Sequence, residues 1–413
     1  MRKTYFTRNR TRTLYQAEPA GPYLDDFTHW LEQQGYRHDT IRRRLRGAAQ
    51  FVAWAHTTGW HVHDLNSTLL AEFHRSLARC GQRVYPSGHP TVRSLGAQHF
   101  LAFVQAEGLA AAPATTSMPA LPPLLVDFQH WMHRHRGVTA QTLRNYTPII
   151  LDLLTTRGGQ LEPLDAKGLR AFILDRARRH GKGAAKNVVT ATRMFVRFLI
   201  AIGRCTPGLD DAIPTIAMWR LATLPQYLPA EDVEHLLTAC DPSTPLGARD
   251  RAVLLLMVRL GLRANDVAGL QVGDINWQES TLVVCGKSRR ETCLPLPQEV
   301  GDALLHYLTD ARPPTHAPTV FLTTLAPWRP ISPQVVSQTA ARAIRQAALT
   351  APATGARVLR HSAATAMLRQ GASLQTIGDI LRHTSIETTA HYAKVDLGLL
   401  AHVVHPWPEG VPC

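Results

Sequence analysis

A short motif that occurs twice limits what the first half of this chain can fold into. Asp26–Trp30 recurs as Asp127–Trp131, 101 residues later, and Thr40–Arg42 recurs as Thr142–Arg144, 102 residues later, each with one substitution. In both copies the apolar residues fall three and four positions apart, which is typical of amphipathic helices. The sequence therefore predicts two small helical bundles built on one plan, with the aromatic residues facing their cores.

Two segments punctuated by proline and alanine, residues 111–123 and 206–229, interrupt the helical pattern. They predict three folded units joined by two linkers. The expected parts are a basic arm at 1–20, a first helical unit at 21–112, a linker at 113–122, a second helical unit at 123–206, a linker at 207–224, a third unit at 225–398 and a tail at 399–413. The apolar residues of the tail favour a contact with a neighbouring protomer.

Basic residues outnumber acidic ones by 45 to 31, so the chain carries a formal net charge of +14. This excess attracts polyanions before any specific contact forms, which makes nucleic acid the first partner to test. A basic soluble surface or attraction to anionic lipid would fit the same composition. No apolar run approaches the ~20 residues of a membrane span. The N-terminus does not resemble a signal peptide, so we expect a cytoplasmic protein with no membrane contact.

The sequence offers little for a metal ion or a nucleotide cofactor. Six cysteines are scattered without a C-x-x-C pair, which favours neither a disulfide framework nor a zinc site. Gly286–Ser288 mimics the end of a P-loop, but Thr281 stands where the upstream glycine is required. Metal-dependent transposase or nuclease chemistry would need converging carboxylates that cannot be placed in this acid-poor chain. We therefore expect no metal and no cofactor.

Basic side chains fall on the helix faces opposite the apolar stripes of the first two units. At these spacings they could track a phosphate backbone, although a solvated charged face is an equally good reading for any single residue. The candidates for DNA binding are Arg42, Arg44, Arg144, Lys182, Lys186, Arg193 and Arg197.

In the third unit the hydrophobic pattern changes once from a helical period to a strand period. The chain is expected to be helical from Pro229–Asp232 through Leu270, with a break between helices after Gly261. Residues 281–285 and 291–296 then read as two short strands around a polar tip. Helices follow, one ending at Gly371, one capped by Ser373, and one over 386–393 capped by Ser385.

Single residues of this unit carry little information alone. Arg263 follows Gly261 at a helix break, where an arginine is usually a cap. Tyr392 on a short helix is usually a packing residue, and Lys287 at a hairpin tip is usually solvated. The order in which such residues occur is more specific.

Four ordered motifs resemble those of tyrosine recombinases of the phage integrase type. They are Gly261-Leu262-Arg263, Gly286-Lys287, Leu359-Arg360-His361-x-x-Ala364-Thr365 and Leu381-x-His383 followed by Tyr392. The intervals of 24 residues from Arg263 to Lys287, 23 from Arg360 to His383 and 9 from His383 to Tyr392 are typical of bacterial members. The resemblance is strongest over residues 225–398, and residues 123–206 look like the family's helical core-binding domain.

The resemblance implies a mainly α fold with a small β-hairpin or sheet, in which two helical DNA-binding units precede a mixed α/β catalytic domain. It implies that Arg263 and Arg360 bind the scissile phosphate, that Tyr392 is the nucleophile, and that Lys287 is the acid for the leaving oxygen. His383 is the remaining member of the set of catalytic residues that the resemblance implies. Asp266 resembles the residue that orients the first arginine.

One position departs from the family pattern, because Arg357 stands where a histidine is most common. Arginine cannot act as a base at any useful pH, but it can donate hydrogen bonds to a phosphate or to the tyrosine oxygen. We expect an altered but active site that includes Arg357.

The implied reaction is the cutting and rejoining of double-stranded DNA through a 3′-phosphotyrosyl intermediate, without metal or ATP. Four protomers, with or without sister recombinases, would exchange strands through a Holliday junction, moving a mobile element and associating with the nucleoid. The alternative is an accessory protein that binds DNA and has lost cleavage.

Overall fold

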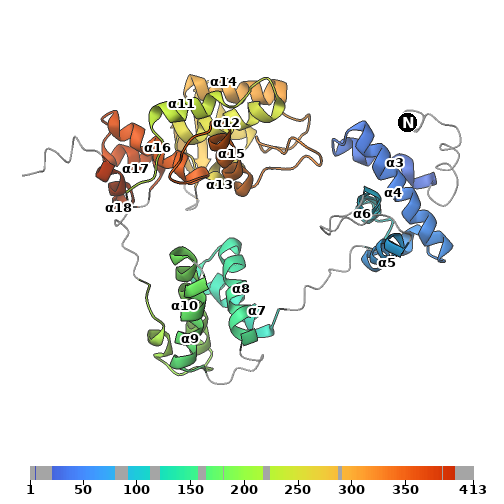
Figure 1. The fold of residues 1–413 in the computed structure, drawn as a ribbon, viewed down its shortest axis with the longest axis horizontal. Coiled ribbons are helices and arrows are strands. Elements are labelled where there is room, and N and C mark those ends of the chain that lie inside the picture. The colour runs from blue at the N-terminus through green and yellow to red at the C-terminus, as the bar shows by residue number, and fades with distance from the viewer. Residues whose placement is uncertain are drawn as a thin grey trace, which may run out of the picture. The chain divides into compact units, whose positions relative to one another are not determined.

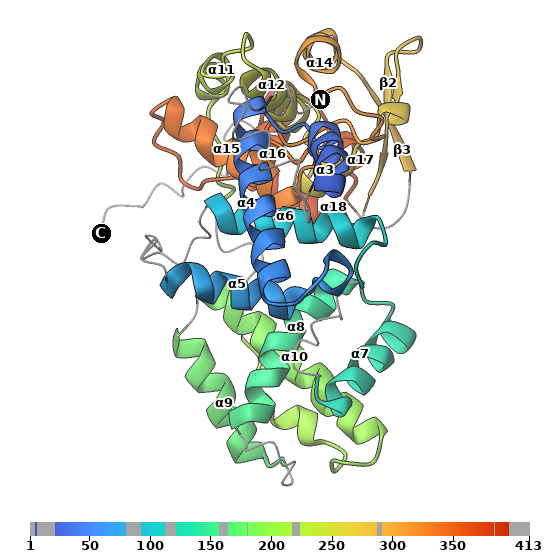
Figure 2. The ribbon, with the colours of Figure 1, turned by 90° about the vertical axis from the view of Figure 1, so that its right-hand side faces the viewer.

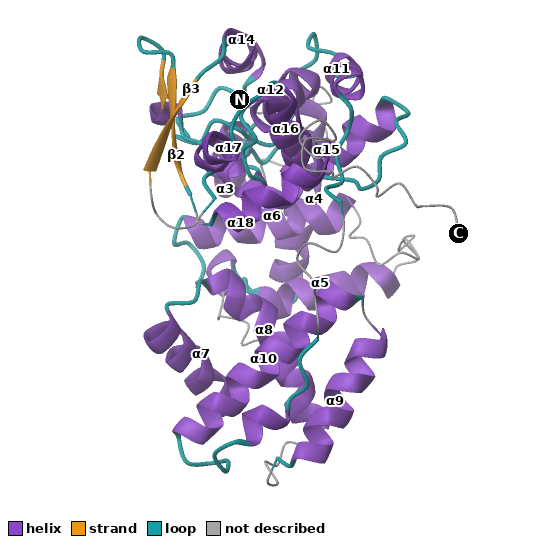
Figure 3. Ribbon diagram, turned by 90° about the vertical axis from the view of Figure 1, so that its left-hand side faces the viewer, coloured by secondary structure: helices purple, strands orange, loops and turns teal. Residues whose placement is uncertain are grey.

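The structure, a computed structural model, describes residues 5, 21–79, 92–111, 121–156, 164–179, 181–216, 224–286, 291–383 and 385–395. The predicted tail and all of the predicted basic arm except Tyr5 lie outside these residues. The chain divides into two compact units, residues 113–220 and residues 1–112 with 221–413. Helices dominate and the strands are few (Figure 3), so the predicted mainly α fold is confirmed.

The blue helices of Figure 1 build the first predicted helical unit around one core of aliphatic and aromatic side chains. They are α3 (Gly21–Gln33), α4 (His38–Thr57), α5 (Ser67–Arg79) and α6 (Val92–Ala106), with the short η1 (Val62–Asp64). Phe27 and Leu31 of the repeated motif are fully buried, as its helical spacing predicts.

The second helical unit repeats this order of four helices. They are α7 (Pro123–Arg136), α8 (Ala140–Thr156), α9 (Ala166–Arg179) and α10 (Lys182–Ala201), and α10 packs against both α8 and α9 (Figure 2). The short η2 (Leu209–Ala212) follows, and Ile213 is buried in the same core. Part of the segment that was predicted to be a linker, residues 209–213, therefore packs on this bundle.

The remaining part of the chain contains eight α-helices among its described residues. They are α11 (Ala230–Thr238), α12 (Pro245–Arg259), α13 (Ala264–Gly269), α14 (Gln298–His306), α15 (Pro333–Gln346), α16 (Ala356–Arg369), α17 (Leu374–Leu381) and α18 (Ile386–Ala390). The predicted helical stretch through Leu270 thus consists of three helices, and the predicted break at Gly261 lies between α12 and α13. Short helical turns η3 (Val272–Asp274), η4 (Tyr307–Ala311) and η5 (His391–Val395) complete this part.

The predicted hairpin is confirmed and gains one strand. Strands β2 (Thr281–Cys285) and β3 (Glu291–Pro295) pair antiparallel, with Val283 opposite Cys293. The two-residue β1 (Ile275–Asn276) pairs with β2, so the sheet order is β1-β2-β3. A strand of two residues has too few positions for an alternating pattern to show in the sequence.

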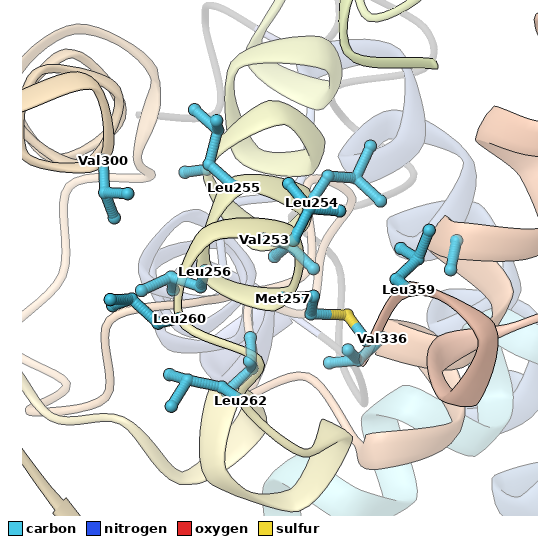
Figure 4. Packing of buried hydrophobic residues seen from close by; sticks show 14 of the residues in the cluster. Val253, Leu254, Leu255, Leu256, Met257, Leu260, Leu262, Val300, Val336 and Leu359 are labelled. Carbon is cyan, nitrogen blue, oxygen red and sulfur yellow. The ribbon is translucent and has the colours of Figure 1, made fainter. Parts of the chain in front are cut away.

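Helix α12 is the centre of the largest core because its residues 252–258 are apolar on every side of the helix. Val253 to Met257 are all fully buried. In Figure 4, Leu255 and Leu256 lie on the side of Val300, whereas Met257 lies toward Val336 and Leu359. A helix that is hydrophobic all round must be enclosed by other elements, so α14, α15 and α16 all pack against it. In the described part of the chain, no helix combines the length and the apolar character that crossing a membrane requires.

Side-chain caps fix where several of these helices begin. Ser373 accepts a hydrogen bond from the backbone N–H of Thr376 at the start of α17. Ser385 accepts one from Glu387 at the start of α18, as predicted. The predicted helix over 386–393 is in fact α18 followed by the tighter turn of η5, and η5 carries Tyr392.

Candidate active site

Two arginines from distant parts of the chain are held at one turn, the end of α17. The guanidinium Nη2 of Arg263 donates a hydrogen bond to the carbonyl oxygen of Arg382, at 3.2 Å. Arg360 on α16 donates to the preceding carbonyl, that of Leu381, and also to the carbonyl of Gly261. Consecutive carbonyl groups therefore fix two guanidiniums whose residues are 97 positions apart in the sequence.

The break that presents Arg263 depends on Gly261. This glycine has a φ of +59°, in the left-handed region that favours glycine, and it separates α12 from α13. A side chain at this position would collide with Leu381 of α17. The turn thus lets the α12–α13 connection and the end of α17 approach each other, and the two arginines meet there.

Arg382 ties this turn together. It has a φ of +55°, a conformation that costs a non-glycine residue roughly 1–2 kcal/mol. Its side chain is only 8% exposed and forms an ion pair with the buried carboxylate of Asp266. Asp266 also accepts the backbone N–H of Arg263, at 3.0 Å. In these contacts Asp266 holds the backbone of Arg263 and the side chain of Arg382, not the Arg263 guanidinium.

Tyr392 is 3% exposed and its hydroxyl oxygen lies 2.9 Å from Nδ1 of His361. His361 follows Arg360 on α16, and its other ring nitrogen, Nε2, accepts a hydrogen bond from Nε of Arg357 at 3.1 Å. The ring of His383 is nearly parallel to that of Tyr392, at 9°, with a centroid distance of 6.4 Å. Nδ1 of His383 lies 2.8 Å from the hydroxyl of the buried Thr389. One phenol is thus surrounded by imidazole and guanidinium groups.

Burial and positive charge act in opposite directions on the tyrosine. Burial raises the pKa of Tyr392, while Arg360, Arg357 and Arg263 lower it. Burial, with Arg263 next, lowers the pKa of Arg360 to about 10. At neutral pH the arginine therefore stays charged and favours the phenolate.

His361 and His383 are both neutral at physiological pH. Burial, followed by the charge of Arg357, lowers the pKa of His361 to about 4. Burial, followed by the charges of Arg360 and Arg263, lowers that of His383 to about 4. The positive charge of the site therefore resides on its arginines. Fixed guanidiniums beside a phenol suit the binding of a phosphodiester and the stabilisation of an anionic transition state.

Comparison with known proteins identifies the chain. Residues 226–397 match the phage integrase family. The putative integrase/recombinase y4rA of Sinorhizobium fredii (strain NBRC 101917 / NGR234) is 33% identical over 400 residues, which span 94% of this chain and 96% of the relative. The chain belongs to the phage integrase family of tyrosine recombinases. It is a site-specific DNA recombinase.

Two further comparisons agree with the family. The tyrosine recombinase XerD of Xanthomonas campestris pv. campestris is 31% identical over 308 residues, covering 69% of this chain and 94% of XerD. Among solved structures, a lambda integrase tetramer bound to a Holliday junction has a TM-score of 0.52 and 18% identity, covering 76% of this chain and 90% of that one. The recombinase thus shares its fold with lambda integrase.

The structure describes some of the predicted catalytic residues but not all of them. It brings together Arg263, Arg357, Arg360, His383 and Tyr392. Lys287 lies outside the described residues, although the strands that flank it are in place. Among the described residues of this recombinase, no group of three His, Cys, Asp or Glu side chains is placed to hold a metal ion.

The predicted DNA-binding residues differ in what they already contact. Arg193 donates to the carbonyl of Ile213 at 2.9 Å, and Arg197 forms an ion pair with Asp210 at 2.8 Å. Both therefore fasten the segment after α10 to the second bundle. Arg144 and Lys186 are exposed, and the side chain of Lys182 lies outside the description.

In the first helical unit the predicted DNA-binding residues are partly enclosed. Arg42 lies 3.3 Å from Asp39, one helical turn away. Arg44 is half-buried and burial lowers its pKa. Arg42 and Arg44 are therefore less available for contact with DNA than their spacing suggests.

Two site residues were missed by the sequence reasoning. His361 occurs inside a quoted motif without a role, and its spacing of four from Arg357 on a helix is a signal that could have found it. Arg382 fills the variable position between Leu381 and His383. Nothing in the sequence signals that it has a left-handed backbone and a buried carboxylate partner.

Proposed function

We propose that this recombinase cuts and rejoins double-stranded DNA by attack of Tyr392 on a phosphodiester, giving a 3′-phosphotyrosyl intermediate. The observation that carries this proposal is the convergence of Arg263 and Arg360 on consecutive carbonyls of one turn, with the Tyr392 hydroxyl within their electrostatic reach. Guanidiniums fixed in this way need no reorganisation when negative charge develops on the oxygens bound to phosphorus.

The phenolic oxygen of Tyr392 forms a bond to phosphorus while the bond from phosphorus to the deoxyribose 5′-oxygen breaks. The phenolic proton leaves to solvent, and the 5′-oxygen takes a proton to become a hydroxyl. Rejoining runs in reverse, with the 5′-hydroxyl of another strand displacing Tyr392, so no energy source is consumed.

Lys287 is the proposed donor of the proton to the 5′-oxygen. Lysine gives up a proton more readily than arginine, whose guanidinium stays charged. Gly286, the residue before it, lies close to Arg382, since a Cβ on this glycine would be 3.7 Å from Nη1 of Arg382. The base of the hairpin tip therefore adjoins the arginine cluster.

The other site residues support the phosphate and the nucleophile. Arg357 contributes positive charge that lowers the pKa of Tyr392. His383 packs its ring parallel to the tyrosine and keeps it in place, with Thr389 orienting the imidazole. Asp266 fixes the backbone of Arg263.

Duplex DNA is the proposed substrate, and a tetramer on DNA is the proposed assembly. The net charge of +14 supports the first, and the lambda integrase tetramer bound to a Holliday junction supports the second. The integrase relatives support a role in moving a mobile element. Sister recombinases would be partners if one protomer type cannot complete both strand exchanges.

The decisive test is a covalent adduct. Nicked duplexes from the DNA flanking the gene release a short fragment on cleavage and trap the intermediate, which a denaturing gel detects. The wild-type protein is expected to form an adduct in excess EDTA, and Tyr392→Phe none. The released end should accept phosphate from polynucleotide kinase directly, as a 5′-hydroxyl does. No adduct from wild type on any flanking site would favour the accessory protein instead.

The role of Lys287 has its own test. Lys287→Ala should slow cleavage of an ordinary phosphodiester by roughly 100-fold or more, the scale of general acid catalysis. A substrate with sulfur in place of the 5′-bridging oxygen needs no proton to leave, so the variant should cleave it at close to the wild-type rate. Equal slowing on both substrates would contradict the assignment.

A further inference from the structure

His361 makes two hydrogen bonds that together fix its chemical form. Its Nε2 receives the Nε–H of Arg357 at 3.1 Å, and its Nδ1 lies 2.9 Å from the hydroxyl of Tyr392. The first contact connects one turn of α16 to the next, and the second connects α16 to η5. The imidazole therefore bridges an arginine and the proposed nucleophile.

The direction of the first bond is not ambiguous. An arginine Nε always carries its hydrogen and can only donate, so Nε2 of His361 must supply a lone pair. A neutral imidazole with a lone pair on Nε2 carries its one proton on Nδ1. The Nδ1–H then points at the Tyr392 hydroxyl and donates to its oxygen.

We propose that His361 is a catalytic residue that donates a hydrogen bond to the Tyr392 oxygen and stabilises the phenolate, and that Arg357 is the positioning residue that sets this tautomer. This inference rests on the proposed function, because it assumes that Tyr392 is the nucleophile. It gives the arginine at 357 a specific task. His361 does not take the tyrosine proton, because its Nδ1 already carries one and its Nε2 faces Arg357.

The surroundings support a neutral donor. His361 faces Arg357 and Arg360 on α16, His391 and Tyr392 on η5, and the ring of His383 beyond the tyrosine. Burial, then Arg357, His391 and Arg360, lowers its pKa to about 4. At neutral pH the ring therefore has one proton, and Arg357 determines which nitrogen holds it.

Two amide substitutions of His361 distinguish a hydrogen-bond donor from a general base at this position. The amide nitrogen of asparagine can take the place of Nδ1, whereas glutamine places its amide near Nε2, and neither can act as a base. His361→Gln should slow single-turnover cleavage about 100-fold, the scale seen when one such donor is removed. His361→Asn should lose 10-fold or less. Equal losses of 100-fold in both would show that His361 acts as a base and would overturn the proposal.

The tautomer of His361 can be determined from its ¹⁵N signals without any DNA cleavage. In the full chain labelled with ¹⁵N-histidine, the His361 signals are assigned as those missing from His361→Asn. The expected result is a protonated Nδ1 and an unprotonated Nε2 at pH 7. The opposite tautomer would overturn the proposal even if both variants folded poorly.

Arg357→Ala tests the positioning role through its pH dependence. Without Arg357 the neutral ring can place its proton on Nε2, but a doubly protonated ring again donates from Nδ1. The ratio of variant to wild-type cleavage rates should therefore rise as pH falls from 8 to 5.5. Repeating the ratio in a His391→Gln background removes the titration of the neighbouring imidazole. A ratio that falls with pH would contradict the tautomer mechanism.

Failure of this inference differs from failure of the proposed function. If wild type forms no adduct with DNA, then Tyr392 is not the nucleophile and the proposed function fails. If wild type forms the adduct but His361→Asn is no better than His361→Gln, only the donor role of His361 fails.

Discussion

The two helical units share an aromatic cluster almost ring for ring. In the first, Phe27 of α3 packs edge-on against Phe100 of α6, with centroids 5.3 Å apart and an interplanar angle of 88°. In the second, Phe128 of α7 meets Phe195 of α10 at 5.3 Å and 89°. The repeated motif therefore extends to the last helix of each unit, where the sequences align with a shift of 95 instead of 101.

The units differ where their second and fourth helices meet. Gly47 of α4 and Gly96 of α6 bring two backbones into contact, since a Cβ on Gly96 would lie 2.6 Å from the Arg44 carbonyl and 2.7 Å from the Gly47 Cα. The corresponding positions of the second unit hold Ile149 and Ala191. An isoleucine side chain prevents so close an approach. The comparison shows that one aromatic core accommodates two different spacings of the helices around it.

The largest effect is expected from removing the shared aromatic cluster. Phe100→Ala and Phe195→Ala should each destabilise their own unit by about 3–5 kcal/mol, because both rings are fully buried. Hydrogen exchange followed by mass spectrometry on the full chain reports each unit separately. Phe→Leu at the same positions should cost clearly less. Losses that differ between the units by more than about 2 kcal/mol would mean that the clusters are not equivalent.

The second-largest effect on stability should be opposite in sign to the usual effect of replacing glycine by alanine inside a helix. Replacing glycine by alanine inside a helix usually stabilises it by roughly 0.5–1 kcal/mol. Gly96→Ala should instead destabilise the first unit by about 1–3 kcal/mol, because its new methyl group meets the α4 backbone. The reverse change in the second unit, Ala191→Gly, should cost only about 0.5–1 kcal/mol. Stabilisation by Gly96→Ala in the same exchange experiment would show that the helices can move apart freely.

The sequence predicted the elements better than it predicted how they meet. Helical spacing located Phe27 and Phe128 in cores, and strand alternation located the hairpin. The contact between Gly47 and Gly96 leaves no periodic signal, because it joins two helices across 49 residues. The split of α12 from α13 was predicted at Gly261 and follows from its left-handed turn, whereas the split of α11 from α12 was not predicted.

For the site, the resemblance supplied the residues and the structure supplied their partners. Arg263, Arg360 and Tyr392 were predicted from ordered motifs, since each alone would have been read as a cap or a packing residue. The link from Arg357 through His361 to Tyr392 needs the fold of η5 against α16, which no local pattern encodes. Arg193 had the spacing of a DNA-facing residue, yet it bonds the carbonyl of Ile213.

A smaller effect is expected from the exposed cations, and it tests whether the two units contact DNA alike. Arg144→Ala with Lys186→Ala should lower the slope of log affinity against log salt by roughly 2, because each phosphate contact contributes about 0.9. Arg42→Ala with Arg44→Ala should change the slope by less than about 1, since Arg42 is paired and Arg44 is half-buried. Fluorescence anisotropy with a duplex at several salt concentrations measures both. Equal changes would show that the two units follow the DNA backbone equally.

The smallest effect concerns the share of His74 in the acid sensitivity of the first unit, which also contains His99, whose pKa burial lowers to about 4. Nε2 of His74 on α5 lies 2.7 Å from the Ser94 hydroxyl on α6, and burial lowers the pKa of this imidazole. The unfolded chain therefore takes up a proton first as pH falls below about 6.5, so stability is lost toward acid and is retained above that value. Helix α9, in the same place in the second unit, has no histidine.

His74→Gln keeps a hydrogen-bonding side chain beside Ser94 but cannot titrate. The wild-type first unit should lose protection between pH 7.5 and 5.5, after correction for the intrinsic exchange rate, and the variant should lose less. The difference should stay well below the roughly 1.36 kcal/mol of one full pKa unit, because the imidazole is partly exposed and screened. A variant that loses as much protection as wild type would place the acid sensitivity elsewhere in the unit. An equal loss in the second unit would remove this difference between the two copies.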